Sequence, residues 1–460
     1  MSDTPFSVRG KRVVVVGAAR SGVAAAELLV RRGASVTLTD IREQVEDEDR
    51  LRAAGVALEL GGHHASTLSG ADLIVLSPGV PSHQPAIEAA RRAGVPVTGE
   101  LELASRWLRG RIVAITGTKG KSTTTTLTGR MLEAGGYRVL VGGNIGLALS
   151  AQVEASTDET IHVIEASSFQ LESAQTFKPW IAVLLNFSPD HLDRHATVDE
   201  YAAAKARIFA RQQPTDWAVL NADDPGTLEL AAHTRAHRLL FSLSGAAPAG
   251  VGLTQDAIVR RTANGEESLV PLAAVKLLGR HLLADVLAAS AVASIVGVDA
   301  AAMTKAVEGF TGLEHALEPV AEIGGVRFVN DSKATNIEAS RRAVESFGDG
   351  VVVVLGGRFK GGDFRDLLPP LVERHATVVS IGESRPLIRE ALGSAVALRE
   401  AEDMSSAVRQ AFASASPGQT VVLAPACSSF DMFRDYAERG RVFKQEVRKL
   451  QEEWSTTREQ

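Results

Sequence analysis

The chain has few of the residues that covalent cross-links and structural metal sites require. Its 460 residues include one cysteine, Cys427, so no disulfide can form within the chain. It contains neither a CxxC pair nor a Cys/His spacing of the kind that holds structural zinc. The sequence therefore favours neither a disulfide scaffold nor a zinc domain.

Long apolar segments and a strong excess of one charge are also missing. No apolar run approaches the ~18 residues of a membrane helix, and the first residues, MSDTPFSVRGKRVVVVG, lack the apolar core of a signal peptide. The net charge is -6 and the pI is near 6.0, which argues against nucleic acid or an anionic membrane as the main partner. We therefore expect a cytoplasmic protein without nucleic-acid or membrane partners, and we also expect a monomer.

The composition is that of an ordinary globular protein, with 45% hydrophobic and 23% charged residues. At roughly 150 residues per domain, the length predicts about three domains. One set of predicted strands and helices ends near residues 102–110 and a new set begins there. A second candidate domain boundary lies near residues 309–313. We expect domains over residues 1–106, 107–312 and 313–460.

Continuous apolar runs, each followed by a helical stretch, recur along the chain. Examples are RVVVVG at residues 12–17, RIVAITG at 111–117 and GVVVVLGG at 350–357. This alternation predicts an α/β fold with parallel sheets covered on both faces. Residues 242–281 carry short alternating runs and turn residues instead, which predicts a small antiparallel insertion in the central domain. The expected architecture is a Rossmann-like N-terminal domain, a P-loop-type central domain with this insertion, and a Rossmann-like C-terminal domain.

The segment ITGTKGKSTTTTL, residues 115–127, predicts a phosphate-binding loop between a strand and a helix. It is a shortened GxxGKS form, because the first glycine of the usual GxxxxGK[ST] pattern would fall at Ile115. Glycines let backbone N–H groups approach phosphate oxygens, Lys121 can reach the outer phosphates, and the Ser122 hydroxyl can bind Mg²⁺. A glycine-rich turn before a polar helix start is the alternative; the preceding strand and the Thr-rich helix favour phosphate binding.

The first loop of the chain is a weaker nucleotide signal. GAARSG contains Gly17 and Gly22 but has Ala19 where a dinucleotide-binding GxGxxG needs glycine. Asp40 ends the following strand, where that fold places an acid for the ribose. The pattern favours a nucleotide-binding relative of that fold over an NAD dehydrogenase, an alternative that rests on this loop alone.

Acidic and imidazole side chains follow two further strands of the central part. Glu165 ends one of them, and the next is followed by Asn186, Asp190, His191, Asp193 and His195. Such density beside a phosphate loop predicts a Mg²⁺ shell, because hard cations prefer oxygen ligands. A helix N-terminus capped by Ser188 or Asp190 explains the same residues equally well. Lys205, in an Ala-rich helix, is by itself typical of a surface lysine.

The C-terminal part has polar clusters after three strands. They are FVNDSKATNIEAS with Asp331, Lys333 and Thr335, LGGRFKGGDF with Lys360, and APACSSFDMF with Ser429. Loops at the carboxyl ends of parallel strands are where α/β folds bind ligands.

These motifs occur in one order: TGTKGKST, GGNIG, EASSFQLE, DHLDRH, YAAAKARIF, NDSKATN, LGGxxKG and PACSSFD. Together they closely resemble the Mur ligases, and NDSKATN resembles the branch that adds D-glutamate. The resemblance runs essentially from end to end. It implies that the first domain binds the uridine nucleotide, that the second is the ATPase, and that the third completes the nucleotide site and binds the incoming amino acid.

The resemblance also implies an activity. It is ATP-dependent amide-bond formation between UDP-N-acetylmuramoyl-L-alanine and D-glutamate through an acyl phosphate. This is a step of peptidoglycan precursor synthesis, on which cell shape and division depend. The expected cofactors are ATP and two Mg²⁺ ions, with Lys205 carbamylated by CO₂ to an anionic metal ligand.

Residue roles follow from the same resemblance. The catalytic residues would be Lys121, His191, Lys205 and Lys333. The ATP-binding residues would be Gly117, Thr118, Lys119, Gly120, Lys121, Ser122, Thr123 and Asp331. The metal ligands would be Ser122, Glu165, His191 and Lys205. The UDP-substrate would contact Ser21, Asp40, Arg42, Ser77, Pro78, Gly79 and Asn144. D-Glutamate would contact Thr335, Lys360, Ser429 and Tyr436.

Four positions differ from the usual family pattern. Lys119 stands where an asparagine is usual, Leu282 and Asp285 stand where two asparagines near the adenine are common, and Ala316 replaces an arginine. We hypothesise that Lys119 supplies some of the missing positive charge. Another ATP-dependent amide ligase of the superfamily, or a module that uses ATP as a switch, remain alternative functions.

Overall fold

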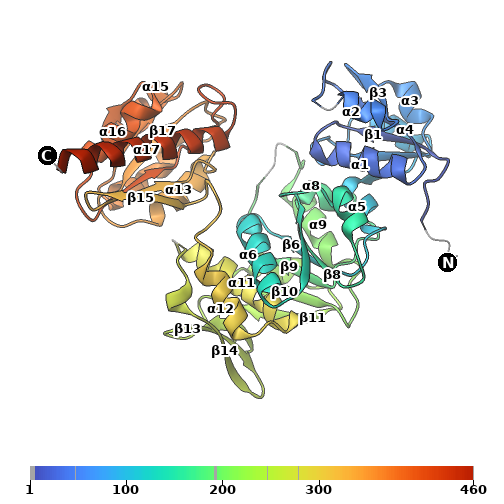
Figure 1. Ribbon diagram of the computed structural model, residues 1–460, viewed down its shortest axis with the longest axis horizontal. Helices are drawn as coiled ribbons and strands as arrows, with labels where there is room; N and C mark the ends of the chain where they lie inside the picture. The colour runs from blue at the N-terminus through green and yellow to red at the C-terminus, as the bar shows by residue number, and fades with distance from the viewer. Residues whose placement is uncertain (1–5, 47, 191–193, 246, 278, 459–460) are drawn as a thin grey trace. The chain divides into compact units, whose positions relative to one another are not determined.

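The computed structural model describes residues 6–458 apart from 47, 191–193, 246 and 278 (Figure 1). Contacts divide the chain into two units. The first comprises residues 1–275 and 283–309, and the second comprises residues 276–282 and 310–460. The first unit contains a five-stranded and a nine-stranded sheet, and the second contains a six-stranded sheet.

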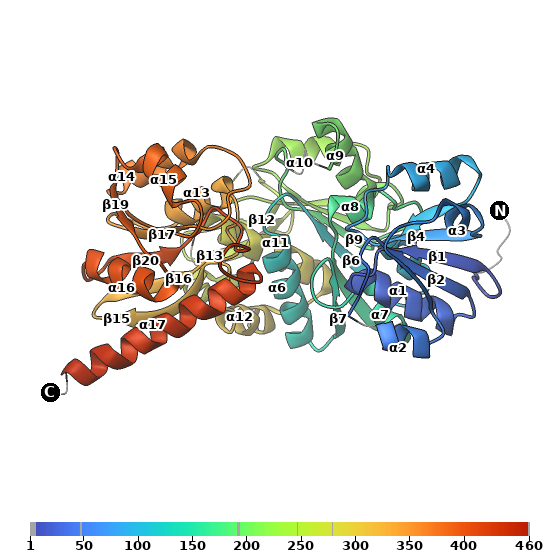
Figure 2. The same ribbon diagram turned by 90° about the horizontal axis from the view of Figure 1, so that it is seen from above.

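The N-terminal sheet is parallel, with strand order β3-β2-β1-β4-β5. Its strands are β1 (Arg12–Val16), β2 (Ser35–Asp40), β3 (Ala57–Leu60), β4 (Leu73–Leu76) and β5 (Val97–Gly99), and its helices are α1 (Arg20–Arg31), α2 (Glu48–Ala53), α3 (Ala65–Ser69), α4 (Pro85–Arg92) and α5 (Glu100–Ser105). Helices α1 and α2 cover one face and α3 and α4 the other (Figure 2). Alternate residues of β1 enter the two resulting cores, Val13 and Val15 on one face, Val14 and Val16 on the other.

The central sheet has the order β14-β13-β12-β11-β10-β9-β6-β8-β7. Its strands are β6 (Arg111–Thr116), β7 (Arg138–Gly143), β8 (Thr160–Glu165), β9 (Ile181–Leu184), β10 (Trp217–Asn221), β11 (His237–Phe241), β12 (Gly250–Leu253), β13 (Ala257–Thr262) and β14 (Gly265–Pro271). Its helices are α6 (Lys121–Ala134), α7 (Leu149–Gln152), α8 (Ser168–Leu171), α9 (Val198–Ala206), α10 (Pro225–Leu230), α11 (Arg280–Val296) and α12 (Ala300–Glu308).

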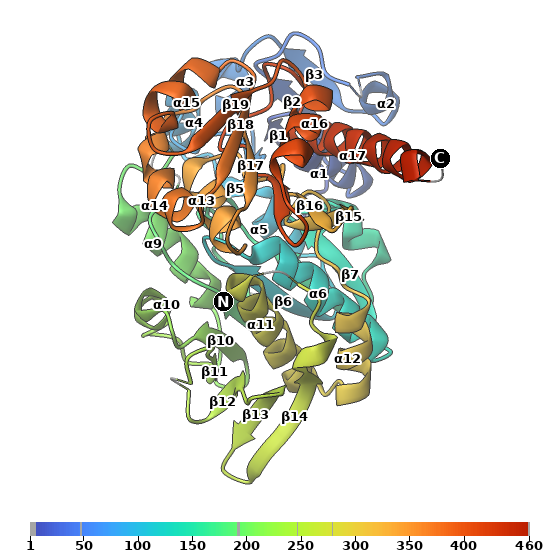
Figure 3. The same cartoon turned by 90° about the vertical axis from the view of Figure 1, so that its left-hand side faces the viewer.

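The predicted antiparallel insertion is confirmed and extends this sheet. Strands β6 to β12 pair in parallel, whereas β12, β13 and β14 pair antiparallel at one edge. Figure 3 shows the β13–β14 hairpin at the end of the sheet beyond β11 and β12.

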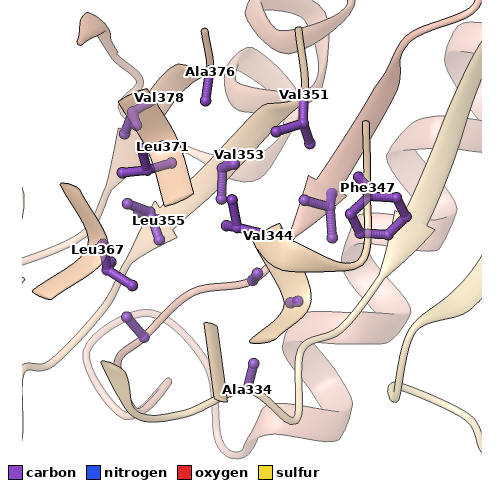
Figure 4. Close-up of a cluster of buried hydrophobic side chains, with 14 of the residues drawn as sticks. Ala334, Val344, Phe347, Val351, Val353, Leu355, Leu367, Leu371, Ala376 and Val378 are labelled. Atoms are coloured by element: carbon purple, nitrogen blue, oxygen red, sulfur yellow. The ribbon is translucent and has the colours of Figure 1, made fainter. Parts of the chain in front are cut away.

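The C-terminal sheet has the order β15-β16-β20-β17-β18-β19, parallel except for β15. Its strands are β15 (Glu318–Ile323), β16 (Val326–Asn330), β17 (Val352–Gly356), β18 (Thr377–Ile381), β19 (Ala397–Glu400) and β20 (Thr420–Leu423), and its helices are α13 (Ile337–Glu345), α14 (Leu368–Glu373), α15 (Arg385–Leu392), α16 (Met404–Ser414) and α17 (Tyr436–Arg458). One of its two cores is formed by side chains such as Val344, Val353 and Leu355 (Figure 4).

The parallel strands bring the predicted site residues to one edge of each sheet. In the central sheet the phosphate loop follows β6, Glu165 ends β8, and Asn186 follows β9. These strands are neighbours, because β6 lies between β8 and β9. The fold therefore gathers three segments that are far apart in the sequence.

Candidate active site

The phosphate loop connects β6 directly to α6. Gly120 is the residue before α6 and has φ +82°, a left-handed conformation that favours glycine. A Cβ at this position would lie 2.1 Å from Oδ1 of Asp285. The loop therefore needs glycine here for two reasons, and the amides of the first turn of α6 face the loop as an anion site requires.

The end of β9 fixes the shape of the loop. Oδ1 of Asn186 accepts hydrogen bonds from the backbone N–H groups of Thr118 (3.0 Å) and Lys119 (2.8 Å), and its Nδ2 donates to Lys119 O (3.1 Å). The Thr118 hydroxyl donates to Ser188 O at 3.0 Å. Asn186, one of the polar residues predicted either to bind Mg²⁺ or to cap a helix, thus holds the phosphate loop in place. The side chain that caps α9 is Thr197, which accepts from Glu200 N (3.1 Å), so neither Ser188 nor Asp190 has that role.

Two lysine amines meet at one carbonyl of the loop. Lys121 Nζ lies 3.0 Å and Lys205 Nζ 2.7 Å from Gly117 O. Lys205 is 1% exposed, and its amine lies 4.7 Å from the centre of the Tyr201 ring. Burial, together with the charge of Lys121, lowers the pKa of Lys205 to about 6. Lys205 is therefore a buried and predominantly neutral amine at pH 7, contrary to the pattern of a surface lysine.

Glu165 offers an unused oxygen to this cluster. It is 1% exposed, and its Oε1 accepts a hydrogen bond from Asn144 Nδ2 at 2.7 Å. Its Oε2 is buried without a hydrogen-bond partner within the described part of the chain. A buried carboxylate oxygen with free lone pairs fits a bound cation.

The cluster fits a Mg²⁺ ion that is held together with nucleotide phosphates. Among the residues that the structure describes, no three His, Cys, Asp or Glu side chains gather into a metal-binding group. Mg²⁺ is commonly held by one or two carboxylates together with substrate phosphates and water. Glu165 and the Ser122 hydroxyl at the start of α6 supply such a set, while the predicted ligand His191 lies outside the described residues.

The two unusual residues of the loop region, Lys119 and Asp285, have different surroundings. Lys119 Nζ pairs with Asp190 Oδ2 at 3.1 Å. Asp285 is 4% exposed, and burial raises its pKa well above the usual range, against the smaller opposite effects of the Thr124 hydroxyl and the Lys121 charge. Lys119 thus shares its charge with a carboxylate, and Asp285 is a buried acid with a raised pKa beside Gly120.

Asp40 and Arg42, which are predicted to contact the UDP-substrate, pair with each other at the end of β2. Asp40 accepts hydrogen bonds from Ala18 N (2.6 Å) and bidentately from Arg42 (2.9 Å each), and the arginine lowers the pKa of the carboxyl. Arg42 lines a cavity of about 490 Å³ with Ala18 and Gly146. Asp40 is therefore satisfied by protein groups and organises the loop that borders this cavity.

The loop after β4 packs against the first loop. A Cβ on Gly17 would lie 2.6 Å from Cγ2 of Val80 and 3.0 Å from Cβ of Ser77, so glycine at 17 permits the contact. Ser77 and Pro78 line a second cavity, of about 460 Å³, together with Phe169 and Arg194. Of the predicted UDP-substrate residues, Arg42, Ser77 and Pro78 thus line two cavities of the first unit.

Of the predicted D-glutamate residues, Thr335, Lys360 and Ser429 lie in loops of the second unit, and Tyr436 is the first residue of α17. Lys360 Nζ is 3.5 Å from Thr335 Oγ1, Ser429 is buried and Tyr436 is exposed. Asp331, which accepts from Leu317 N at 3.1 Å, has a pKa raised by burial to about 7. The structure brings Lys360 and Thr335 together.

Arg439 is a site residue that the sequence pattern missed. It is 1% exposed and donates to Ser332 O (2.8 Å), Ser332 Oγ (3.0 Å) and Cys427 O (3.0 Å). It thereby joins the NDSKATN loop to the PACSSFD loop. Its only sequence signal is an arginine near the start of a long charged helix, which is otherwise typical of a solvent-facing residue.

The fold and the site define an α/β nucleotide-binding protein whose phosphate loop lies beside side chains able to hold Mg²⁺. Family models match most of the chain: the MurD-like N-terminal domain of Mur ligases matches residues 11–99, the Mur ligase middle domain residues 115–293, and the Mur ligase glutamate ligase domain residues 317–427. The chain belongs to the Mur ligase family.

Curated relatives are similar over nearly the full length. A UDP-N-acetylmuramoylalanine–D-glutamate ligase from Acidobacterium capsulatum is 46% identical over 444 residues, which cover 95% of this chain and 96% of the relative. An enzyme of the same name from Koribacter versatilis is 44% identical, with 97% and 99% covered.

Solved structures of other ligases share the fold. A UDP-N-acetylmuramate–alanine ligase from Thermotoga maritima has a TM-score of 0.61 at 19% identity and covers 95% of this chain and 99% of its own. A pseudomurein peptide ligase from Methanothermus fervidus has a TM-score of 0.58 at 17% identity, with 96% and 100% covered.

Proposed function

We propose that this chain is an ATP-dependent ligase that joins D-glutamate to UDP-N-acetylmuramoyl-L-alanine in peptidoglycan precursor synthesis. Full-length similarity to relatives with that printed activity supports the choice of substrates. The site observation that carries the proposal is the meeting of Lys121 and Lys205 at Gly117 O beside Glu165. A switch protein that only binds ATP has no use for a second, buried lysine at its phosphate loop.

The reaction would proceed in two steps. The terminal carboxylate of the UDP-linked substrate attacks the γ-phosphorus of ATP, which gives an acyl phosphate and ADP. The neutral amine of D-glutamate then attacks the acyl carbon, the C–O bond to phosphate breaks, and the amine proton leaves. Lys121, at the start of α6, would offset the charge that accumulates as two anions approach each other.

Mur ligases use Mg²⁺ with ATP, and Glu165 and Ser122 fit such an ion. When bound, Mg²⁺ neutralises phosphate charge and orients the transferred group. We propose two such sites, with His191 serving the second. Lys205 would contribute as a carbamate: its neutral amine attacks CO₂, a C–N bond forms, and one proton is released. Burial of the amine supports this step, because only the unprotonated form reacts.

We retain the remaining assignments as proposals. Ser21, Asp40, Arg42, Ser77, Pro78, Gly79 and Asn144 would hold the UDP-substrate. Gly117, Thr118, Lys119, Gly120 and Thr123 would hold ATP, with Asp331 and the catalytic Lys333. Thr335, Lys360, Ser429 and Tyr436 would hold D-glutamate. Domain boundaries at residues 106 and 312, a monomeric state and a cytoplasmic location likewise remain predictions. Within the described residues, no helix has both the length and the apolar character needed to cross a membrane.

A substrate matrix tests the proposal. Phosphate release from ATP is measured with UDP-N-acetylmuramoyl-L-alanine and, in turn, D-glutamate, L-glutamate, L-alanine and meso-diaminopimelate. We expect release only when the UDP-substrate and D-glutamate are both present. Release with ATP alone would support the switch alternative, and equal rates with L-glutamate or diaminopimelate would support a different amide ligase.

A further inference from the structure

Arg194 belongs to the central segment between β9 and α9, but its guanidinium lies on a loop of the N-terminal sheet. It donates to the carbonyl oxygens of Pro78 (3.4 Å), Gly79 (3.2 Å) and Val80 (2.6 Å). On its other side, the guanidinium carbon lies 4.7 Å from the centre of the Phe169 ring of α8. The arginine thus binds three consecutive carbonyls while an aromatic ring supports it.

Only arginine is suited to this contact. Its planar guanidinium carries five N–H donors in a fixed fork and stacks on aromatic rings, whereas a lysine ammonium is a compact point charge. The three carbonyls belong to the turn closed by the hydrogen bond from Val80 N to Ser77 O at 2.9 Å. Arg194 therefore sets the conformation of a turn that carries proposed UDP-substrate contacts.

The segment that carries Arg194 also touches the phosphate loop. Ser188 O accepts from the Thr118 hydroxyl at 3.0 Å, and Asp190 Oδ2 pairs with Lys119 Nζ at 3.1 Å. Ser188 and Asp190 thus contact the ATP loop, and Arg194, four residues further along the sequence, contacts the substrate turn.

We propose that Arg194 is a positioning residue that couples the two ligand loops. It holds residues 78–80 in the conformation that binds the UDP-linked substrate, and through residues 188–190 this conformation depends on the state of the phosphate loop. Binding of nucleotide and of the UDP-linked substrate then favour each other, because a coupling free energy acts equally in both directions. The inference rests on the proposed function, which assigns the UDP-substrate to Ser77, Pro78 and Gly79.

The test is calorimetric titration of UDP-N-acetylmuramoyl-L-alanine into the full chain, with and without a non-hydrolysable ATP analogue and Mg²⁺. In the wild type we expect the nucleotide to lower the substrate Kd at least ~5-fold. Arg194→Gln should raise the Kd about tenfold without nucleotide, as expected on losing charge-assisted hydrogen bonds, and bring the coupling factor close to 1. Arg194→Lys should recover part of the affinity but not the coupling.

Two controls separate positioning from damage to the fold. Arg211 is an exposed arginine of the central domain that donates to Gln175 O (2.6 Å), so Arg211→Gln should leave both affinity and coupling unchanged. Hydrogen exchange at the amides of Gly79, Val80 and Ser82 should accelerate in Arg194→Gln, while exchange in α6 stays at its wild-type rate. At saturating substrate, kcat should change less than threefold, so the loss appears in KM.

Arg194→Gln with wild-type affinity and coupling would overturn the proposal. So would a variant that loses affinity but keeps the coupling factor, because Arg194 would then be a local contact only. A wild type that binds both ligands with coupling but makes no product with D-glutamate contradicts the proposed function and not the coupling. A wild type that fails to bind the UDP-substrate overturns both.

Discussion

The buried amine of Lys205 gives the sharpest prediction about catalysis. With a pKa of about 6, the side chain is about 99% neutral at pH 8, whereas a lysine with an ordinary pKa near 10.4 is under ~1% neutral. CO₂ reacts only with the neutral amine, so the reactive fraction of Lys205 is more than ~100 times that of an ordinary surface lysine. We therefore expect Lys205 to form a carbamate near neutral pH.

Replacement of Lys205 by alanine should lower kcat about 10²–10³-fold, the loss typical of removing one electrostatic group from a transition state. Because Lys205 is 1% exposed, the alanine leaves enclosed space beside Gly117. Millimolar formate or acetate should enter it and restore part of the rate. Lys205→Met removes the amine but fills the space, so it should lose the same activity without rescue. Lys305→Ala, at an exposed position of α12, is the matched control and should keep the wild-type rate.

The carbamate itself can be observed. Protein equilibrated with ¹³C-bicarbonate should show a carbamate carbon signal by NMR, absent from Lys205→Met and retained in Lys305→Ala. Phosphate release should also fall in CO₂-free buffer and recover with bicarbonate. A Lys205→Ala enzyme of near wild-type rate, or a carbamate signal that survives in Lys205→Met, would refute the reasoning.

Three further substitutions test other contacts. Lys119→Ala breaks the half-buried pair with Asp190 and should raise the ATP KM about three- to fivefold, in line with ~1 kcal/mol for such a pair; an unchanged KM would show that Lys119 supplies no useful charge. Gly120→Ala should lower the ATP affinity measured by calorimetry more than ~10-fold, because a left-handed alanine costs about 1–2 kcal/mol and its Cβ would meet Asp285. The control is Gly94→Ala, where φ is +86° and the space around a Cβ is open; it should leave ATP binding intact. Asp331 has a folded-state pKa raised to about 7. Its contribution to stability is therefore present below pH ~4 and is lost as pH rises through about 7, by at most ~4 kcal/mol. The free energy of unfolding of Asp331→Asn, measured with urea, should rise relative to that of the wild type between pH 4.5 and 8, and a difference that stays constant over this range would contradict the assignment.

The strands and the phosphate loop were predictable because local pattern determines them. The apolar runs that begin at Arg12, Arg111 and Val352 form β1, β6 and β17, since strands buried on both faces need continuous apolar sequence. The phosphate loop could be predicted from its glycines for the same reason, because a left-handed backbone conformation close to an anion favours glycine over residues with a side chain.

Contacts between distant segments were not predictable. Lys205 has the sequence pattern of a surface lysine. Nothing in its Ala-rich helix indicates that its amine contacts Gly117 after β6, 88 residues away in the sequence. Arg194 and its carbonyl partners are more than a hundred residues apart, and Arg439 reaches a loop 107 residues away. Asn186 was noticed as one of a polar group, but its role as a loop anchor depends on the pairing of β6 with β9.

The central claim is that the terminal phosphate of ATP is transferred to the carboxylate of the UDP-linked substrate, and oxygen-isotope transfer tests it most directly. UDP-N-acetylmuramoyl-L-alanine with ¹⁸O in its terminal carboxylate is turned over with ATP and D-glutamate in ordinary water, and the released phosphate is analysed by mass spectrometry. Formation of an acyl phosphate predicts one ¹⁸O atom in each phosphate released, because the bridging oxygen comes from the carboxylate. Phosphate without ¹⁸O would mean that water receives the phosphoryl group, and would contradict the account.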